Sequence, residues 1–168
     1  MQLYTMVATW FGCGNIAKAQ GTVASFATVL FLPAVIFSNL FGILITILIT
    51  VIGLLAIPKY LLDHPHVVDP KEIVIDEVIG QLIAFTIPII FFRYYQYIPQ
   101  TFNILYTLFY IKIFTISFIF FRIFDITKIW PINIIEQIPG TSGIILDDVL
   151  AGIMSSICTI FIIAKMGT

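Results

Sequence analysis

The stretch that decides the fold is Ile73-Val74-Ile75-Asp76-Glu77-Val78-Ile79-Gly80, in which two adjacent acids stand at the start of a long apolar run. A carboxylate inside an apolar membrane segment costs about 2.5 to 3.5 kcal/mol on insertion scales, so two together indicate a function. The pattern returns at Ile145-Leu146-Asp147-Asp148-Val149-Leu150-Ala151, with the same order of apolar, acidic and small residues. We therefore predict two helices that each start with a diacid pair and together form one metal site.

The composition around these acids is typical of an integral membrane protein. Of the 168 residues, 60% are hydrophobic and only 10% are charged, and the mean hydropathy is +1.10. Soluble domains are less apolar and more charged. The net charge of -1 offers no basic surface, so no nucleic-acid partner is expected. We expect a single all-α domain, residues 1–168, built as a bundle of four to five apolar membrane helices with the polar loops on one face.

Breaks in the apolar pattern divide the chain. The glycine-punctuated segment 10–25 is predicted to be a loop, and Ser38-Asn39 is predicted to be the turn of a first hairpin, residues 24–57. The first arm of this hairpin is short and contains Pro33, so whether it spans the membrane stays open. The predicted helices cover residues 24–37, 40–57, about 70–92, 102–121 and about 146–164.

An even number of crossings between the polar segments brings them to one side of the membrane. On this count the side of the N-terminal segment holds all nine acids, at or near the membrane boundary, and five of the eight basic residues. The excess of Lys and Arg predicts that this side is cytoplasmic. The acids are Asp63, Asp69, Glu72, Asp76, Glu77, Asp125, Glu136, Asp147 and Asp148.

These residue types favour phosphoryl chemistry. Carboxylate oxygens select Mg²⁺ or Mn²⁺ over softer metals. The helix start beside Gly140-Thr141-Ser142-Gly143 offers free backbone N–H groups to a phosphate oxygen. Arg122 and Lys128 are expected to neutralise charge on that phosphate, and Asp125 to hold a second metal ion or a water molecule. The combination predicts a metal-assisted reaction on a phosphate that is reached from the bilayer.

Four blocks of the chain resemble a known family: residues 12–25, Asp69 to Gly80, Phe121 to Ile132, and Gly143 to Gly152. The first is similar to Gly-x-Gly-x-x-Pro-x-Ala-Pro-Gly-Thr-x-Gly-Ser and the third to Phe-Arg-x-x-Asp-x-x-Lys-Pro-x-Pro-Ile, both motifs of the phosphatidylglycerophosphatase A family of bacterial membrane enzymes. The second and fourth blocks resemble its two diacid motifs. This chain departs from the family at Ala17, Gln20 and Ile129, which replace prolines, and at Ala24, which replaces a glycine. None of these departures removes an acid, a cation or a hydroxyl group.

The resemblance implies Mg²⁺-dependent hydrolysis of phosphatidylglycerophosphate to phosphatidylglycerol and phosphate. It also implies a multi-pass protein of the bacterial inner membrane, with its active site on the cytoplasmic face. Within the matching blocks we predict roles for eleven residues. Catalytic roles are predicted for Asp69, Asp125, Arg122 and Lys128, metal binding for Asp76, Glu77, Asp147 and Asp148, and contact with the substrate phosphate for Lys18, Gly21 and Thr22.

Other interpretations stay open. A membrane phosphotransferase would use the same metal with an alcohol as acceptor. A cation carrier would need acids near the middle of the bilayer, whereas these acids stand at span ends. The acid pairs could also serve only the helix dipole, and Asp69, directly before Pro70, equally suits a helix cap. His64 and His66 are interpreted as solvated, and Cys13 and Cys158 as reduced bystanders.

Overall fold

The computed structural model describes residues 2–16, 18–65, 70–96 and 104–166, which form helices joined by short connections and no strand. Five helical segments are long and apolar enough to cross a membrane. They are Gln20–Phe37, Asn39–Asp63, Ile75–Tyr94, Ile104–Thr127 and Thr141–Met166. The predicted all-α bundle of membrane helices is confirmed, and the chain has the architecture of a multi-pass membrane protein.

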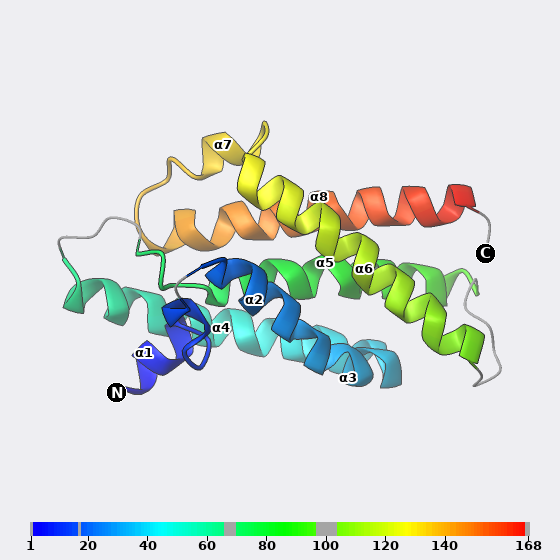
Figure 1. The fold of residues 1–168 in the computed structure, drawn as a ribbon, viewed down its shortest axis with the longest axis horizontal. Coiled ribbons are helices and arrows are strands. Elements are labelled where there is room, and N and C mark those ends of the chain that lie inside the picture. Colours follow the sequence, from blue (N-terminus) through cyan, green and yellow to red (C-terminus); the bar gives the residue numbers. More distant parts are fainter. Residues whose placement is uncertain (1, 17, 66–69, 97–103, 167–168) are drawn as a thin grey trace.

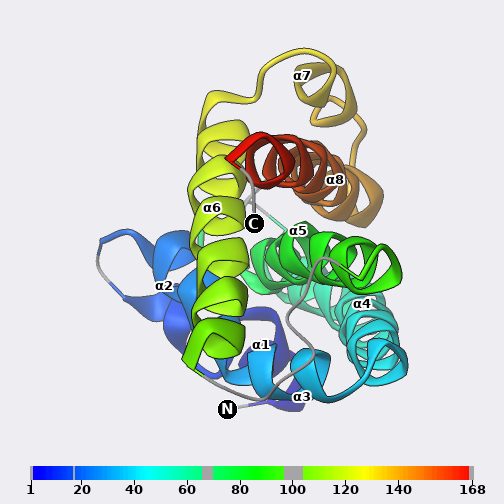
Figure 2. The ribbon, with the colours of Figure 1, turned by 90° about the vertical axis from the view of Figure 1, so that its right-hand side faces the viewer.

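Helix α5 (Ile75–Tyr94) is the centre of the bundle. Figure 2 shows it between α4 (Asn39–Asp63) and α8 (Thr141–Met166), with α6 (Ile104–Thr127) crossing at the side. In the apolar 18-residue stretch of α5, 72% of the residues are buried inside the protein, against 28% to 33% in the other four segments. The diacid helix is therefore enclosed by protein, while its neighbours present apolar side chains outward for lipid.

The first hairpin is formed as predicted, but its first arm begins earlier. Helix α2 (Gln20–Ala27) continues through a 3-10 turn (Thr28–Phe31) into α3 (Leu32–Phe37), and Ser38 then caps α4 by accepting a hydrogen bond from the N–H of Leu40 at 3.2 Å. The prediction of a loop over the whole of residues 10–25 is wrong for its second half. Between Gln20 and Ser25, Gly21 is the one residue that disfavours a helix. The small side chains Ala24 and Ser25 are buried in the bundle.

The rest of that N-terminal segment holds two short elements, α1 (Leu3–Ala8) and a 3-10 turn (Cys13–Asn15). Helix α1 packs against α4. The hydroxyl group of Tyr4 donates a hydrogen bond to the Asp63 carboxylate at the end of α4. The chain before α2 is thereby attached to the same end of the bundle at which α4 ends and α5 begins (Figure 1).

Four other helix boundaries differ from the prediction. Helix α4 runs to Asp63, six residues past the predicted end at Ile57. Helix α5 begins at Ile75 instead of near Pro70, so Asp76 and Glu77 lie in its first turn. Helix α6 runs to Thr127, six residues past the predicted end at Phe121. Helix α8 begins at Thr141, so Asp147 and Asp148 lie in its second turn and not at its start, contrary to the prediction. The short helix α7 (Ile132–Ile135) lies between α6 and α8.

Helices α5 and α8 approach each other closely just beneath the acids, and both run from the same end of the bundle (Figure 1). A Cβ atom on Gly152 would collide with the carbonyl oxygen of Gly80, and one on Gly80 would stand 2.6 Å from the carbonyl oxygen of Asp148. Only glycine permits backbones at this separation. Because Gly80 comes three residues after Glu77 and Gly152 four residues after Asp148, their contact brings the two acid pairs to the same level.

Candidate active site

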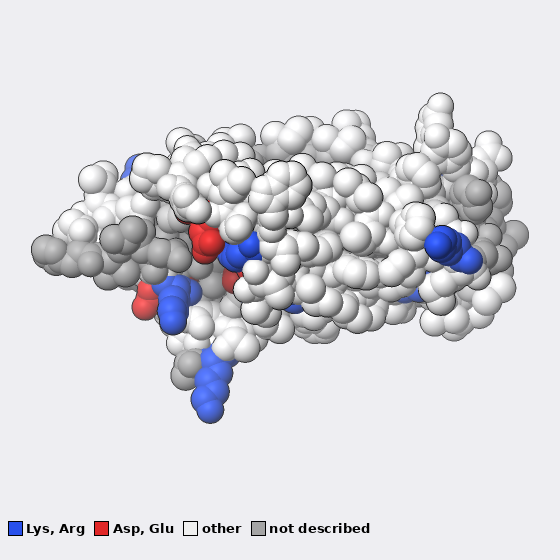
Figure 3. All heavy atoms as spheres, turned by 90° about the horizontal axis from the view of Figure 1, so that it is seen from above, with Lys and Arg blue, Asp and Glu red and all other residues white. Residues whose placement is uncertain are grey.

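A cavity of about 620 Å³ opens at the end of the bundle where α5 and α8 begin and α6 ends. Its walls come from the start of α2, the segment before α5, the last turn of α6 and the connection from α7 to α8. Nine charged residues line it, six of them acids: Lys71, Asp76, Glu77, Arg122, Asp125, Lys128, Glu136, Asp147 and Asp148. Seen from above, Asp and Glu side chains appear only towards this end, whereas Lys and Arg appear at both ends (Figure 3).

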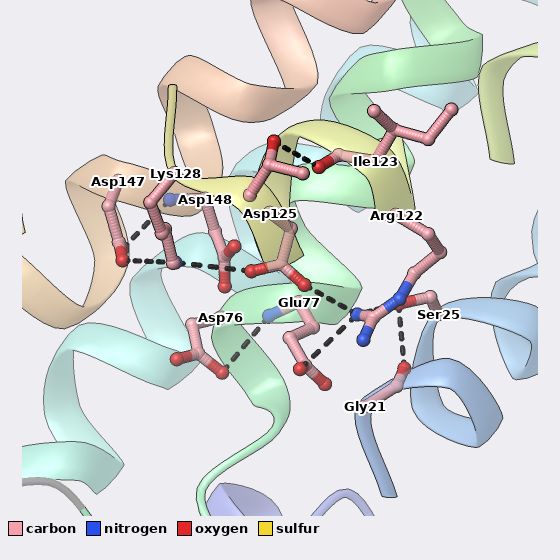
Figure 4. Close-up of polar contacts among 11 residues, drawn as sticks. Gly21, Ser25, Asp76, Glu77, Arg122, Ile123, Asp125, Lys128, Asp147 and Asp148 are labelled. Carbon is pink, nitrogen blue, oxygen red and sulfur yellow. Dashed lines mark hydrogen bonds and ion pairs between the residues drawn. The ribbon is translucent and has the colours of Figure 1, made fainter. Parts of the chain in front are cut away.

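Five side chains form a chain of alternating charge across the cavity (Figure 4). The guanidinium Nη1 of Arg122 lies 3.3 Å from Glu77 Oε1 and 2.6 Å from Asp125 Oδ2. The ammonium Nζ of Lys128 lies 3.1 Å from Asp125 Oδ1 and 2.6 Å from Asp147 Oδ2. Helix α6 supplies Arg122 and Asp125, and the residue directly after it is Lys128. This end of α6 therefore joins the acids of α5 to those of α8.

Lys128 reaches this chain from the first residue after α6. Its backbone has a φ of 43°, in the left-handed region, and its N–H bonds to the carbonyl oxygen of Phe124 at 2.9 Å. Burial acts to lower the pKa of Lys128, but the carboxylates of Asp148, Asp125 and Asp147 outweigh it and raise the pKa well above its usual value. Lys128 therefore stays protonated at neutral pH, so its contribution is a fixed positive charge and not the transfer of a proton.

The remaining carboxylates are buried with few partners. Asp76 and Asp148 are 9% and 2% exposed. One oxygen of Asp76 accepts the N–H of Glu77 at 3.0 Å, and one of Asp147 accepts the N–H of Asp148 at 2.9 Å. Within the described part of the chain, Glu77 Oε2, Asp148 Oδ1 and Arg122 Nε are buried without a hydrogen-bond partner. Such groups are rare in proteins and costly, so they indicate a ligand site.

The structure brings together most of the predicted site residues, with three exceptions. Gly21 lines the cavity, and a Cβ atom there would collide with the Glu77 carboxylate. Lys18 is exposed and Thr22 is half-buried, and neither lines the cavity. Asp69 lies outside the described residues. Of the predicted phosphate loop, Gly140 and Gly143 line the cavity, but α8 has already begun at Thr141.

The cations stand between the acids, so the carboxylates do not converge on one point. Among the described residues, no group of three or more His, Cys, Asp or Glu side chains is placed to hold a metal ion. The donors present are nevertheless all oxygens, and Glu77 Oε2 and Asp148 Oδ1 have unused acceptor capacity. Mg²⁺ commonly takes only one or two protein carboxylates and completes its shell with water and phosphate oxygens. The donor set therefore fits Mg²⁺.

Four residues around the site escaped the sequence-based prediction. Ser25 accepts a hydrogen bond from Arg122 Nη1 at 3.4 Å, and Lys71 and Glu136 line the cavity. Gln81 is fully buried one turn after Glu77. Its position four residues after an acid on a predicted helix was a usable signal, because such residues share a helix face. Glu136, in an irregular connection, gave no such signal.

Comparisons with known proteins agree with this chemistry. The chain matches the family Phosphatidylglycerophosphatase A over residues 6–163, a range that includes every charged residue of the cavity. A protein of Bacteroides thetaiotaomicron named "Putative phosphatidylinositol-3-phosphatase" is 29% identical over 161 residues, which cover 92% of this chain and 90% of that protein. No solved structure matches the chain at a comparable level of significance. The chain belongs to the phosphatidylglycerophosphatase A family of membrane lipid phosphatases, and it is a phosphoric monoester hydrolase.

Proposed function

We propose that this protein hydrolyses phosphatidylglycerophosphate to phosphatidylglycerol and inorganic phosphate, with Mg²⁺ as its cofactor. The observation that carries the proposal is the cavity at one end of the bundle, in which six carboxylates face three cations. An excess of three negative charges in a partly buried site favours binding of a metal cation. The family match supports a lipid phosphate as the substrate.

The position of the cavity suits a phospholipid. It opens at the ends of membrane-spanning helices, and exposed apolar side chains surround the nearby end of α6, among them Ile126 and Trp130 at 68% and 73% exposure. A lipid whose acyl chains stay in the bilayer would present its phosphate at this depth. The excess of basic residues on this side supports a cytoplasmic orientation in a bacterial inner membrane.

The two central cations would bind the phosphate. Arg122 and Lys128 hold Asp125 between them, with both of its oxygens engaged. Asp125 is therefore better suited to orienting the cations than to holding a second metal ion or activating water. Arg122 also keeps an unpartnered Nε–H, a donor that a phosphate oxygen or a neighbouring group can use.

One or two carboxylates drawn from Asp76, Glu77, Asp147 and Asp148 would hold the metal ion, with water and phosphate oxygens completing its shell. When bound, Mg²⁺ would neutralise charge on the phosphate and polarise its oxygens. In the reaction the oxygen of water attacks phosphorus, the bond from phosphorus to the glycerol oxygen breaks, and that oxygen takes a proton. We retain Asp69 as a proposed catalytic residue, to be tested by Asp69→Asn.

Phosphate release by the purified protein tests the proposal. The substrates are phosphatidylglycerophosphate, phosphatidylinositol 3-phosphate and soluble glycerol phosphate, each with Mg²⁺ and with EDTA. We expect the highest kcat/KM for phosphatidylglycerophosphate and loss of turnover with EDTA. Preference for phosphatidylinositol 3-phosphate, the lipid in the name of the Bacteroides thetaiotaomicron relative, would overturn the substrate assignment. Transfer of phosphate to an added alcohol in place of water would show a phosphotransferase, and Mg²⁺ flux across vesicles without phosphate release would show a carrier.

A further inference from the structure

Gln81 is the most isolated polar side chain near the site. It is 0% exposed within α5, and neither Nε2 nor Oε1 has a hydrogen-bond partner among the residues that the structure describes. A buried amide without partners destabilises the folded protein. The Gln81 amide therefore calls for a donor and an acceptor that the other described residues do not supply.

The neighbours of Gln81 on α5 show which way it faces. Residues four apart on a helix lie on the same face. One turn earlier, Glu77 meets Arg122 of α6 and Gly21 of α2. One turn later, the ring of Phe85 lies 5.4 Å from that of Phe114 on α6. Gln81 therefore shares the face of α5 that turns to α6, one turn from the ion pair of Glu77 and Arg122.

The unmet groups at this position complement one another. Among the described residues, Glu77 Oε2 is a buried acceptor that no donor reaches, and Arg122 Nε is a buried donor that no acceptor reaches. The amide of Gln81 carries one group of each kind, so it can donate to the carboxylate and accept from the guanidinium. The nearby hydroxyl groups of α2 are already used, because Ser25 donates to the Gly21 carbonyl oxygen at 2.7 Å and Thr28 to that of Ser25 at 2.6 Å.

We propose that Gln81 is a positioning residue of the phosphatase site, whose amide links Glu77 Oε2 to Arg122 Nε, directly or through a buried water molecule. This link fixes the plane of the Arg122 guanidinium, and so the direction in which Arg122 presents its remaining donors to the substrate phosphate. The inference rests on the proposed function in one respect, that the site hydrolyses a phosphomonoester.

The test replaces Gln81 by an apolar residue of similar length, Gln81→Met. The matched control is Thr86→Val on the same helix. Among the described residues the Thr86 hydroxyl is also buried without a partner. Thr86 however faces α4, since its methyl carbon would lie 3.2 Å from a Cβ atom placed on Gly42. Melting temperature, kcat and KM are measured for both variants in the same detergent. Thr86→Val should melt at or above the wild-type temperature, because it removes an unmet polar group. Gln81→Met should melt below it, because loss of the link leaves Glu77 Oε2 and Arg122 Nε without partners.

Activity should separate the two variants. We expect Gln81→Met to lower kcat/KM about tenfold, as removal of an outer-shell partner commonly does, and Thr86→Val to leave it unchanged. If Gln81 acts through Arg122, replacing Gln81 should lower kcat/KM less in an enzyme that already lacks the Arg122 Nε–H. In an Arg122→Lys background, Gln81→Met should therefore change kcat/KM less than about twofold. Where that background turns over too slowly, the same cycle is read from the Kd for inorganic phosphate.

Two results would overturn the inference. One is a Gln81→Met enzyme that is as active as the wild type, and the other is an equal loss in both backgrounds. Failure of the proposed function would appear differently, as a wild-type enzyme that does not act on phosphatidylglycerophosphate. The cycle is then run on the phosphomonoester that the wild type does hydrolyse.

Discussion

Two arginines mark opposite ends of the bundle, and their surroundings differ. Arg93, in the last turn of α5, donates hydrogen bonds to the carbonyl oxygen of Ile36 at 2.6 Å, to the hydroxyl group of Tyr110 at 3.1 Å and to the side-chain oxygen of Asn39. All of these partners are neutral. Arg122, at the other end, lies beside two carboxylates in a cavity, and its Nε has no partner among the described residues.

This difference separates a structural contact from a functional one. The bonds of Arg93 join α5 to the α3–α4 corner and to α6, and each of them ends on a neutral acceptor. The bonds of Arg122 leave unmet donors and acceptors and an excess of negative charge around an open cavity. Real proteins break the rule of satisfied polar groups mainly at functional sites. Arg93 is therefore expected to support stability, and Arg122 to support turnover.

The largest effect is expected from neutralising the acids at the Arg122 end. Asp76→Asn and Asp147→Asn should each lower phosphate release about 10³-fold or more, because each removes charge that the metal ion and Lys128 need. Both variants should still insert in the membrane. Asp63→Asn is the control, since this exposed acid contacts Tyr4 on the same side of the protein and does not line the cavity. Near-normal turnover in either cavity variant would refute a shared site.

Replacing each arginine separately by methionine tests the difference between Arg93 and Arg122 directly. Arg122→Met should lower kcat/KM about 10² to 10³-fold. Arg93→Met should leave the activity of the folded enzyme unchanged. It should reduce the free energy of unfolding by about 2 to 4 kcal/mol, because buried carbonyl and hydroxyl groups lose their donor. Thermal unfolding in detergent and initial rates measure both quantities. If each variant produced the effect expected of the other, the assignment of the two ends would be reversed.

The membrane spans and the common end of the two acid pairs could be predicted, because they depend on where apolar and polar residues alternate along the chain. Breaks in the apolar runs at Ser38 and before Asp76 were sufficient to predict the spans. The number of spans then predicted that both acid pairs lie at one end of the bundle. The end of α6 was predicted too early because charge begins at Arg122, yet the site itself neutralises that charge and the helix continues to Thr127. Arg122 and Asp125, three residues apart, share one helix face because the helix continues past Arg122, and Lys128 joins them from the residue after its end.

Contacts between helices were not predictable in the same way. The closeness of Gly21 to Glu77, and of Gly80 to Gly152, depends on how α2, α5 and α8 pack. A glycine in a sequence does not tell which backbone or side chain approaches it. The unmet atoms around Gln81 likewise become visible only when the surrounding helices are in place.

A smaller effect is expected from adding a single methyl group at each end. Gly21→Ala should lower kcat/KM about tenfold, because the new Cβ displaces the Glu77 carboxylate from Arg122. Gly42→Ala, on α4, places a Cβ 3.1 Å from a methyl group of Val35, a contact that small shifts can relieve. The gain in helix propensity of about 1 kcal/mol offsets that strain, so activity and stability should both stay near wild type. An active Gly21→Ala enzyme would show that the position of Glu77 is not critical.

The smallest effect expected is the loss of stability when Mg²⁺ is removed. At a free concentration five times its Kd, a ligand that binds only the folded state stabilises it by about 1 kcal/mol, so EDTA should lower the melting temperature by about 2 to 4 °C. The shift should disappear in Asp147→Asn, which lacks a proposed metal ligand. It should keep its full size in Arg93→Met, because distant sites without shared partners contribute additively. An EDTA shift that changed with Arg93 would show that the two ends are coupled through α5, and Arg93 could then no longer be assigned to stability alone.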